Sequence, residues 1–298
     1  MKNLVIIFLL VSSTVFLTSC KVESALFTNG TNVITLSKGF SFTEGPAADA
    51  MGNVYFTDQP NNKIYIWTIQ GELKTFSEDA GRANGLYFYL DGDLLACADL
   101  NNQLWKMGSD GKHTILVSGY EGKLLNGPND LWVHPNGIIY FTDPLYQRPY
   151  WSRNPEKEQD GEYVFCFSPK TEKLTKVAED LVKPNGIIGT PDGKKLYVAD
   201  IGANKTFVYS IQPDGTLNNR KLFVELGSDG MTIDNQGNVY LTGNGVTVFN
   251  PKGNQIAHIP VPAAWTANVC FGGVDHNTLF ITASDGLYAL KMKVHGER

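Results

Sequence analysis

KPNGIIGTPDGKKLYVAD, residues 183–200, decides how the rest of this chain is interpreted. It begins with a short apolar strand after Asn185-Gly186, turns at 191–193 (Pro-Asp-Gly) and returns as a strand of alternating apolar residues that ends at Asp200. Turn residues between two short strands of this pattern predict a β-hairpin. The same hairpin recurs along the chain, which indicates a repeat architecture.

Six copies of the hairpin align on the last residue of the second strand. They are EGPAADAMGNVYFTD (44–58), NGLYFYLDGDLLACAD (84–99), NDLWVHPNGIIYFTD (129–143), NGIIGTPDGKKLYVAD (185–200), DGMTIDNQGNVYLTG (229–243) and NVCFGGVDHNTLFITA (268–283). The steps between copies are 41, 44, 57, 43 and 40 residues. A period of about 40 to 45 residues built from strands and turns is typical of propeller blades. The step of 57 indicates an insertion.

Residues 31–298 are therefore predicted to form one all-β domain, a six-bladed β-propeller with four antiparallel strands per blade. The 30 glycines, 14 prolines and 11% aromatic residues fit a turn-rich β protein. The last blade lacks an outer strand, whereas residues 32–36 read as a strand without a neighbour. We expect this N-terminal strand to close the last blade, which removes two sheet edges together.

The N-terminus has the pattern of an export signal. Lys2 precedes an apolar run from Leu4 to Leu17, which is too short to span a bilayer. The next residues, Leu17-Thr18-Ser19-Cys20, resemble the bacterial lipobox, in which Cys20 is lipidated. We thus expect a lipoprotein signal peptide at 1–19, a lipidated tether at 20–30, and a protein exported and lipid-anchored to a bacterial cell membrane. An ordinary signal peptide with a chance cysteine is the alternative.

Other residues are interpreted as structural. The remaining cysteines lie in strand patterns and are expected to be buried free thiols, and the tryptophans are expected to fill space between blades. These residues are Cys97, Cys166, Cys270, Trp67, Trp105 and Trp132. Trp265 precedes the sixth inner strand; a core position is expected for it, and a position at the mouth is the alternative. A net charge of −5 without a basic run disfavours nucleic acid as a partner, and a monomer is expected.

One polar residue opens each innermost strand, and the antiparallel topology places all six at one mouth of the ring. They are Glu44, Asn84, Asn129, Asn185, Asp229 and Asn268. Two carboxylates and four amides are the hard oxygen donors that Ca²⁺ prefers. The alternative is that Asn-Gly and Asp-Gly serve only as turn residues. Against that alternative, glutamate at position 44 is a poor turn former.

Four of these motifs carry a family resemblance. Glu44-Gly45-Pro46, Asn129-Asp130, Pro184-Asn185-Gly186 and Asp229-Gly230 stand in the order and blade positions found in the senescence-marker / gluconolactonase / luciferin-regenerating family. The chain resembles these six-bladed propellers over essentially its whole mature length, and it is most similar to exported bacterial gluconolactonase-like members. The stretches YEGKLLNGPNDL (120–131) and FTDPLY (141–146) add to the likeness.

The resemblance implies hydrolysis of sugar lactones with a divalent cation, usually Ca²⁺, with Zn²⁺, Mg²⁺ or Mn²⁺ as other candidates. It implies that Glu44, Asn185 and Asp229 hold the cation and that Asn129 joins them or binds substrate. We expect the cation to polarise the lactone carbonyl and Asp229 to orient or deprotonate the attacking water. Asn84 and Asn129 are expected to contact sugar hydroxyls.

The insertion at 144–161, PLYQRPYWSRNPEKEQDG, leaves the mouth end of a second strand and can cover the site. It offers aromatic faces for a sugar ring and guanidinium groups for an anion, from Tyr146, Arg148, Tyr150, Trp151 and Arg153. The alternative is an Ω-loop that packs against the neighbouring blade. Arg82, which precedes Asn84, is a further candidate contact for a substrate carboxylate.

Two other functions remain open. One is a related phosphoester or phosphofluoridate hydrolase that uses the same cation and a carboxylate nucleophile. The other is a surface lipoprotein without enzymatic activity that binds a glycan or a protein. A histidine-dependent lactonase or a serine triad is disfavoured, because no histidine is expected at the mouth; His134 and His276 fall on the opposite face.

Overall fold

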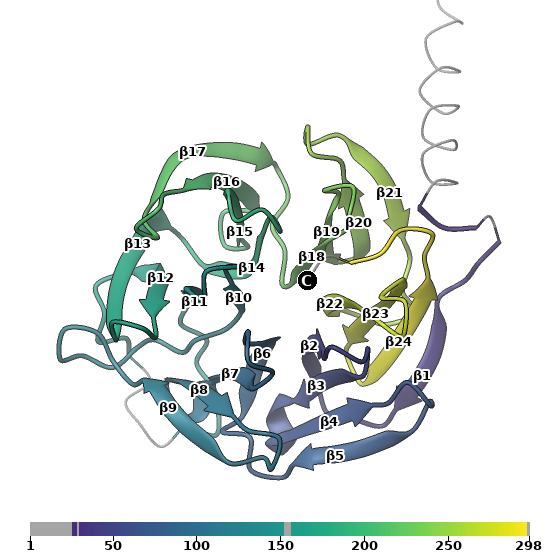
Figure 1. Ribbon diagram of the computed structural model, residues 1–298, viewed down its shortest axis with the longest axis horizontal. Coiled ribbons are helices and arrows are strands. Elements are labelled where there is room, and N and C mark those ends of the chain that lie inside the picture. Colours follow the sequence, from purple (N-terminus) through teal and green to yellow (C-terminus); the bar gives the residue numbers. More distant parts are fainter. Residues whose placement is uncertain (1–25, 29, 152–155, 297–298) are drawn as a thin grey trace, which may run out of the picture.

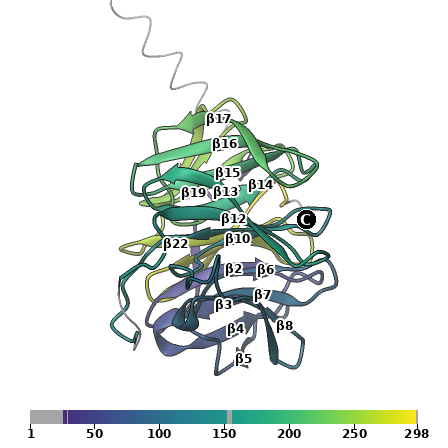
Figure 2. The same cartoon turned by 90° about the vertical axis from the view of Figure 1, so that its left-hand side faces the viewer.

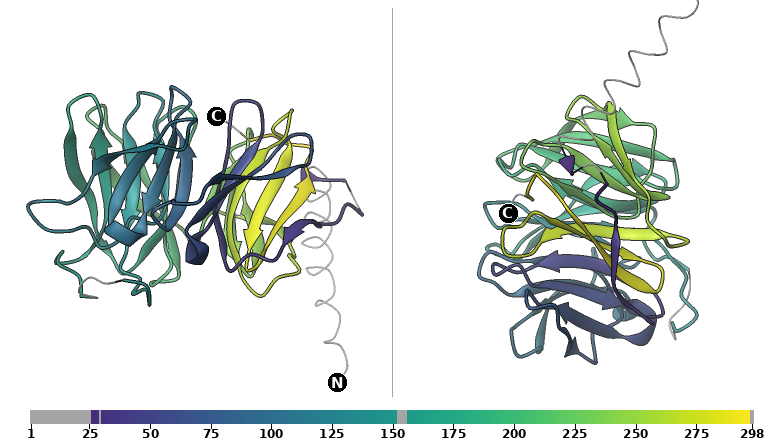
Figure 3. Two further views of the ribbon diagram at one scale, coloured as in Figure 1. Left: turned by 90° about the horizontal axis from the view of Figure 1, so that it is seen from below. Right: turned by 90° about the vertical axis from the view of Figure 1, so that its right-hand side faces the viewer.

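The computed structural model describes residues 26–28, 30–151 and 156–296, and these form six four-stranded antiparallel sheets around a central axis (Figure 1). Figures 2 and 3 show the ring from its edges, with strands running between its two faces. The predicted six-bladed propeller is confirmed. The signal peptide and Cys20 lie outside the described residues. Within the described part of the chain, no helix has the length and apolar character needed to cross a membrane.

The first three blades follow the chain in order, each from its innermost strand outward. Blade 1 comprises β2 (Thr43–Ala48), β3 (Val54–Asp58), β4 (Lys63–Trp67) and β5 (Leu73–Ser77). Blade 2 comprises β6 (Ala83–Phe88), β7 (Leu94–Ala98), β8 (Gln103–Met107) and β9 (His113–Val117). Blade 3 comprises β10 (Leu131–Val133), β11 (Ile139–Asp143), β12 (Glu162–Ser168) and β13 (Lys173–Leu181). The short 3₁₀ turns η1 (Gln59–Asn61) and η2 (Asp99–Asn101) follow the second strands of blades 1 and 2.

The last three blades complete the ring. Blade 4 comprises β14 (Pro184–Gly189), β15 (Lys195–Asp200), β16 (Lys205–Ile211) and β17 (Leu217–Val224). Blade 5 comprises β18 (Met231–Ile233), β19 (Val239–Gly243), β20 (Gly245–Phe249) and β21 (Gln255–Ile259). Blade 6 comprises β22 (Thr266–Gly272), β23 (Thr278–Ala283) and β24 (Gly286–Lys291), with β1 (Ile34–Lys38) as its outer strand.

The N-terminal strand closes the ring as predicted. It pairs antiparallel with β24, from Ile34 opposite Ala289 to Lys38 opposite Gly286. It begins two residues later than the expected range of 32–36, because pairing with β24 starts at Ile34 and Val33 packs instead against the core shared by blades 5 and 6. The Thr43 hydroxyl donates to the carbonyl of Gly286 at 2.8 Å, which ties blade 1 to blade 6.

The core lies between neighbouring blades, as the sequence predicts. Trp105 and Trp132 are buried, and Cys97, Cys166 and Cys270 are free thiols, the last of them half-buried. Cys97 lies in β7, Cys166 in β12 and Cys270 in β22.

Glycines beside the axis allow neighbouring innermost strands to approach closely. A Cβ atom on Gly45 would lie 2.2 Å from the carbonyl oxygen of Asn84, and one on Gly85 would lie 2.6 Å from that of Asn129. A Cβ on Gly230 would overlap the side chain of Asn268. Of the residues before these glycines, none has a positive φ angle. The turn interpretation is therefore wrong for Asn84-Gly85 and Asn185-Gly186, which lie within strands β6 and β14 and whose glycines are required by blade-to-blade contact. Asp229-Gly230 lies in a bend before β18.

Candidate functional site

The six polar residues at the mouth lie where the sequence predicts them. Glu44, Asn84, Asn185 and Asn268 belong to the innermost strands β2, β6, β14 and β22, and Asn129 and Asp229 stand two residues before β10 and β18. All are buried except Asp229, which is half-buried. The structure therefore brings residues from all six blades to one end of the axis.

Threonine hydroxyls fix the backbone at this ring. The Thr57 hydroxyl of blade 1 donates to the carbonyl of Asn84 in blade 2 at 3.1 Å. Thr142 of blade 3 donates to the carbonyl of Asn185 in blade 4 at 2.8 Å. Both threonines come from the repeated Thr-Asp that ends a second strand, so one blade sets the position of a polar residue in the next.

The aspartates after these threonines hold the chain segments that lead into the ring. Asp143 accepts hydrogen bonds from the backbone N–H groups of Asn126 and Gly127 at 2.9 and 2.8 Å, just before Asn129. Asp200 accepts from Val182 and Lys183, both at 2.9 Å, just before Asn185. Because two N–H groups converge on each carboxylate, the backbone ahead of the ring residue is held in one position.

Hydrogen bonds connect four side chains from blades 3 to 6 across the mouth. Asn185 Nδ2 donates to the Tyr146 hydroxyl at 2.9 Å and to Asp229 Oδ1 at 2.8 Å. Trp265 Nε1 donates to Asp229 Oδ2 at 2.5 Å. Trp265 is 40% exposed, so the favoured core position is wrong and the alternative position at the mouth is found. The ring points to the mouth because the indole N–H finds a carboxylate there, and each oxygen of Asp229 accepts one hydrogen bond.

Acidic groups crowd the axis without a matching number of cations. Burial raises the pKa of Glu44 well above its usual range, and repulsion from Asp229 raises it further. Burial also raises the pKa of Asp229 and brings that of Asp130 to about 7. Arg148 is the basic side chain that opposes the increase at both Glu44 and Asp229. Carboxyl groups held together in this way gain most from a positive charge placed among them.

The donor set fits a divalent cation with oxygen ligands. Asn185 Oδ1 is buried and has no hydrogen-bond partner, although its own Nδ2 donates twice. A buried carbonyl oxygen without a partner is costly unless a ligand satisfies it. Among the described residues no group of three or more His, Cys, Asp or Glu is arranged to hold a metal ion. A site here therefore combines the carboxylates of Glu44 and Asp229 with the amide oxygen of Asn185, a set suited to Ca²⁺ rather than to Zn²⁺.

The first half of the insertion reaches both the mouth and the neighbouring blade. Tyr146 bonds to Asn185, as described above, while the Tyr150 hydroxyl and Arg148 Nε donate to Asp99 Oδ2 at 2.7 and 3.2 Å. The binding and the packing interpretations of the insertion thus each describe part of it. Arg153 lies outside the described residues.

Arg82 contacts the insertion through the ring of Tyr150. Its guanidinium carbon lies 4.1 Å from the centre of the Tyr150 ring, and its Nη1 donates to the carbonyl of Pro60. Substrate contact by Arg82 stays a prediction.

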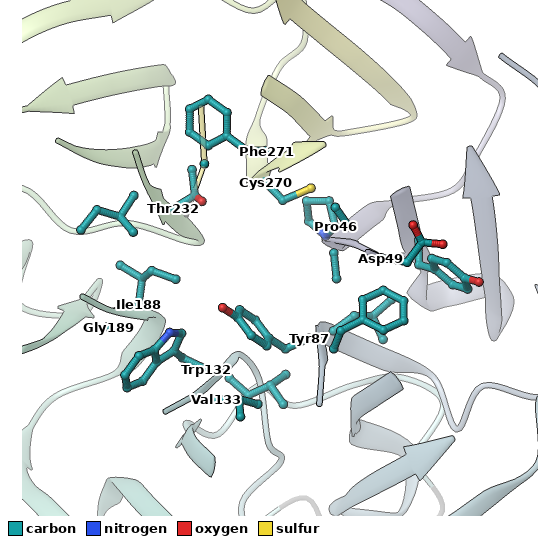
Figure 4. Close-up of a pocket in the computed structure, with 18 of the residues that line it drawn as sticks. Pro46, Asp49, Tyr87, Trp132, Val133, Ile188, Gly189, Thr232, Cys270 and Phe271 are labelled. Carbon is teal, nitrogen blue, oxygen red and sulfur yellow. The ribbon is translucent and has the colours of Figure 1, made fainter. Parts of the chain in front are cut away.

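A cavity of about 720 Å³ lies along the same axis but on the opposite side of the ring. Figure 4 shows residues from all six blades around it, among them Pro46, Tyr87, Trp132, Ile188, Thr232 and Cys270. Asp130 and Asn268 line its inner end, and Pro135, Pro191 and His276 line the end at the turns. Neither Asn185 nor Asp229 lines this cavity, so we assign the candidate site to the mouth, where the polar groups converge.

The sequence patterns assign no role to two acidic residues of the site. Asp130 appears only as the second residue of the Asn129-Asp130 motif, yet its carboxylate accepts from Asn268 Nδ2 across the axis at 3.4 Å. Asp99 ends a second strand, as Asp143 and Asp200 do, yet it anchors the insertion. The sequence does carry a signal for Asp130, because aspartate replaces the glycine that follows the ring residue in four other blades. The place of Trp265 before a strand does not decide between core and mouth.

The sequence and the fold of this chain are similar to those of known proteins. The family model described as "SMP-30/Gluconolactonase/LRE-like region" matches residues 42–285. The gluconolactonase of Zymomonas mobilis is 30% identical to this chain over an alignment 302 residues long. The alignment covers 91% of this chain and 84% of that protein.

Two solved structures resemble the fold closely. The structure of a gluconolactonase from Xanthomonas campestris aligns with a TM-score of 0.85 and 29% identity, covering 91% of this chain and 92% of the other. Regucalcin from Agrobacterium tumefaciens, described as a calcium-binding protein, aligns with a TM-score of 0.74 and covers 88% of this chain and 94% of its own. At 20% identity this second likeness shows the fold alone.

Proposed function

The chain belongs to the SMP-30/gluconolactonase/LRE-like family, and on that premise we propose that it hydrolyses a sugar lactone at the mouth formed by Glu44, Asn185 and Asp229, with a divalent cation. The observation that carries the proposal is the unpartnered, buried Asn185 Oδ1 beside two carboxyl groups of raised pKa. Such a group of oxygen donors at the end of an open axis is suited to a cation and a carbonyl substrate together.

Glu44, Asn185 and Asp229 would hold the cation, with Asn129 as a further ligand or a substrate contact. A divalent cation bound there would polarise the lactone carbonyl and stabilise the negative charge that develops on its oxygen. Ca²⁺ fits the mixed set of carboxylate and amide oxygens best. Glu44 would supply the main negative charge that holds the cation. It is buried, and an ionised carboxylate at this depth needs a positive partner.

Asp229 is the group that we assign to the attacking water. It is half-buried, so water can reach it. In the absence of a cation, burial raises its pKa, and a bound cation would keep it ionised, so that it can orient the water. The hydrogen bonds from Asn185 and Trp265 fix its orientation. Asn84, Asn129 and Tyr146 stand around the mouth and would position the sugar.

The experiment is an assay of purified protein with γ- and δ-aldonolactones and with phosphoesters, each with and without EDTA. Lactone hydrolysis that EDTA abolishes is the expected result. Hydrolysis of phosphoesters alone, or no turnover of any compound, would contradict the proposal in favour of the two alternatives given by the sequence.

The Trp265→Phe variant tests the role of the indole N–H. Removing a donor from a carboxylate raises the carboxylate pKa, so Asp229 should lose its proton only at higher pH. We expect the acidic limb of the pH profile of kcat/KM to move upward by roughly 0.5 to 1 pH unit, since one charge-assisted hydrogen bond contributes about 1.5 to 3 kcal/mol when buried and less here. Trp67→Phe, in β4 of blade 1, is the matched control. An unchanged acidic limb would show that Trp265 does not act through Asp229.

We also propose that the protein is exported and held at a membrane by a lipid on Cys20. The support is the sequence pattern at 17–20 after an apolar run of signal-peptide length. Cys20→Ala is expected to move the protein from the membrane fraction to the soluble exported fraction. Membrane retention of this variant would argue against the lipid anchor.

A further inference from the structure

The rim of the mouth carries two basic side chains that the proposed chemistry does not use. Arg148 lies in the insertion, and Lys183 precedes Asn185 by two residues. The Arg148 guanidinium carbon is 5.2 Å and Lys183 Nζ is 4.7 Å from the centre of the Tyr146 ring. Because the Tyr146 hydroxyl bonds to Asn185, both cations stand one tyrosine ring away from the candidate site.

Arg148 is held by one edge of its guanidinium. Its Nε donates to Asp99 Oδ2, and Asp99 is fixed in turn by the Tyr150 hydroxyl and by Gln59 Nε2 at 3.4 Å. In the described part of the chain, the two Nη groups of Arg148 make no hydrogen bond. A guanidinium fixed at Nε presents its remaining N–H groups as a planar fork, the geometry that binds an oxyanion in two places.

Lys183 makes no ion pair among the described residues, although its side chain is half-buried. Arg148, by contrast, is paired with Asp99 through Nε. Two cations beside one aromatic ring repel each other. Asp99 pairs with Arg148 at Nε alone, and Glu162 interacts with Lys183 electrostatically without forming an ion pair. Asp200 accepts from backbone N–H groups, and Asp229 accepts from Asn185 and Trp265. A bound anion would satisfy both cations at the same time.

From these contacts we propose that Arg148 and Lys183 form a subsite for an oxyanion carried by the sugar lactone, so that the preferred substrate is an acidic sugar lactone with a carboxylate or phosphate remote from the lactone carbonyl. The inference rests on the proposed lactonase function and deepens it. A neutral aldonolactone would leave the subsite empty, and its binding would depend on hydroxyl contacts alone.

The test compares kcat/KM for D-glucono-1,5-lactone with that for D-glucaro-1,4-lactone and for 6-phosphoglucono-1,5-lactone. The wild-type protein is expected to favour at least one acidic lactone by about tenfold or more, and the favoured lactone identifies carboxylate or phosphate as the group recognised. In Arg148→Gln the value for that lactone should fall by about tenfold or more, chiefly through KM, while the value for the neutral lactone changes less than about threefold. Arg148→Lys should lie between the two, because it keeps the charge but loses the fork.

Lys183→Gln is a second variant, with a smaller loss of the same selectivity expected. Arg220→Gln is the matched control, because Arg220 lies over Phe207 in blade 4, in the outer strand β17. In the wild-type protein, 0.5 M NaCl should raise KM for the acidic lactone and not for the neutral one. No preference for an acidic lactone, or equal losses on both substrates in Arg148→Gln, would overturn the inference.

A binding measurement separates this inference from the lactonase proposal. Calorimetric titration with D-glucarate and D-gluconate does not depend on turnover. Tighter binding of the dianion that disappears in Arg148→Gln supports the subsite even if no lactone is hydrolysed. Equal binding of the two sugar acids to the wild-type protein would overturn it even if lactones are hydrolysed.

Discussion

Asp229→Asn is expected to lower kcat/KM for lactone hydrolysis by roughly a thousandfold, because it removes the carboxylate that we assign to the attacking water and to the cation. The fold should be retained. The asparagine has the same shape and can still accept a hydrogen bond from Trp265, while the repulsion that raises the pKa of Glu44 is removed. The unfolding midpoint measured without added cation should therefore be equal to or above that of the wild-type protein.

Circular dichroism and thermal unfolding would accompany the assay of Asp229→Asn. Asp275→Asn provides a matched control, since Asp275 is exposed in the turn between β22 and β23, at the opposite face. Wild-type activity in Asp229→Asn would remove Asp229 from the mechanism. Loss of the β-sheet signal would instead show that the side chain is needed for folding.

Removal of divalent cations is expected to abolish lactone hydrolysis, and excess Ca²⁺ should restore it. The same cation should raise the free energy of unfolding, by about 2.7 kcal/mol when its concentration is one hundred times its Kd. Zn²⁺, Mg²⁺ and Mn²⁺ would be compared in the same assay. Glu44→Gln should weaken the thermal response to Ca²⁺, because it removes the buried charge that we assign as the anchor.

The response to Ca²⁺ should depend on pH in a defined direction. Burial raises the pKa values of Glu44, Asp229 and Asp130 above those of the unfolded chain, that of Asp130 to about 7. Their contribution to the stability of the cation-free protein is therefore present below the ordinary carboxyl pKa of about 4 and lost as pH rises through the folded values. Protons compete with the cation over this range. The increase in unfolding midpoint on adding Ca²⁺ should be larger at pH 8 than at pH 5.5, and full activity after exhaustive chelation would refute the metal site.

The propeller could be predicted because its information is local and repeated. Each blade carries its own hairpin, turn residues and strand alternation, so six imperfect copies reinforce one another. The closing strand could be inferred as well, since one blade lacked a strand and one strand lacked a blade. Its start at Ile34 rather than at 32 depended on pairing with β24, in which the partner of Ile34 is Ala289, 255 residues further along the chain (289 − 34), so that no local signal exists.

The candidate site could be predicted in outline for a related reason. The polar residue that opens each innermost strand holds the same place in every repeat, and ring closure brings equivalent places together. Side-chain direction outside the repeat could not be predicted. Trp265 precedes a strand, where an aromatic residue is most often buried, and only the fold shows its N–H on Asp229. Asp99 ends a second strand in the same way as Asp143 and Asp200, and only the fold shows that Arg148 and Tyr150 of the insertion bind to it.

The amino-acid sequence by itself determined the number of blades, the strands within them and the ring of acidic and amide residues at one mouth, because hydrophobic alternation and turn chemistry act between residues close together in the chain. Only the tertiary structure decided which partners those side chains have: Tyr146 and Asp229 on Asn185, Trp265 on Asp229, and Arg148 on Asp99. These contacts join different blades, and a hydrogen bond depends on atoms meeting within about 3 Å, a condition set by the packing of the whole ring rather than by any one stretch of sequence.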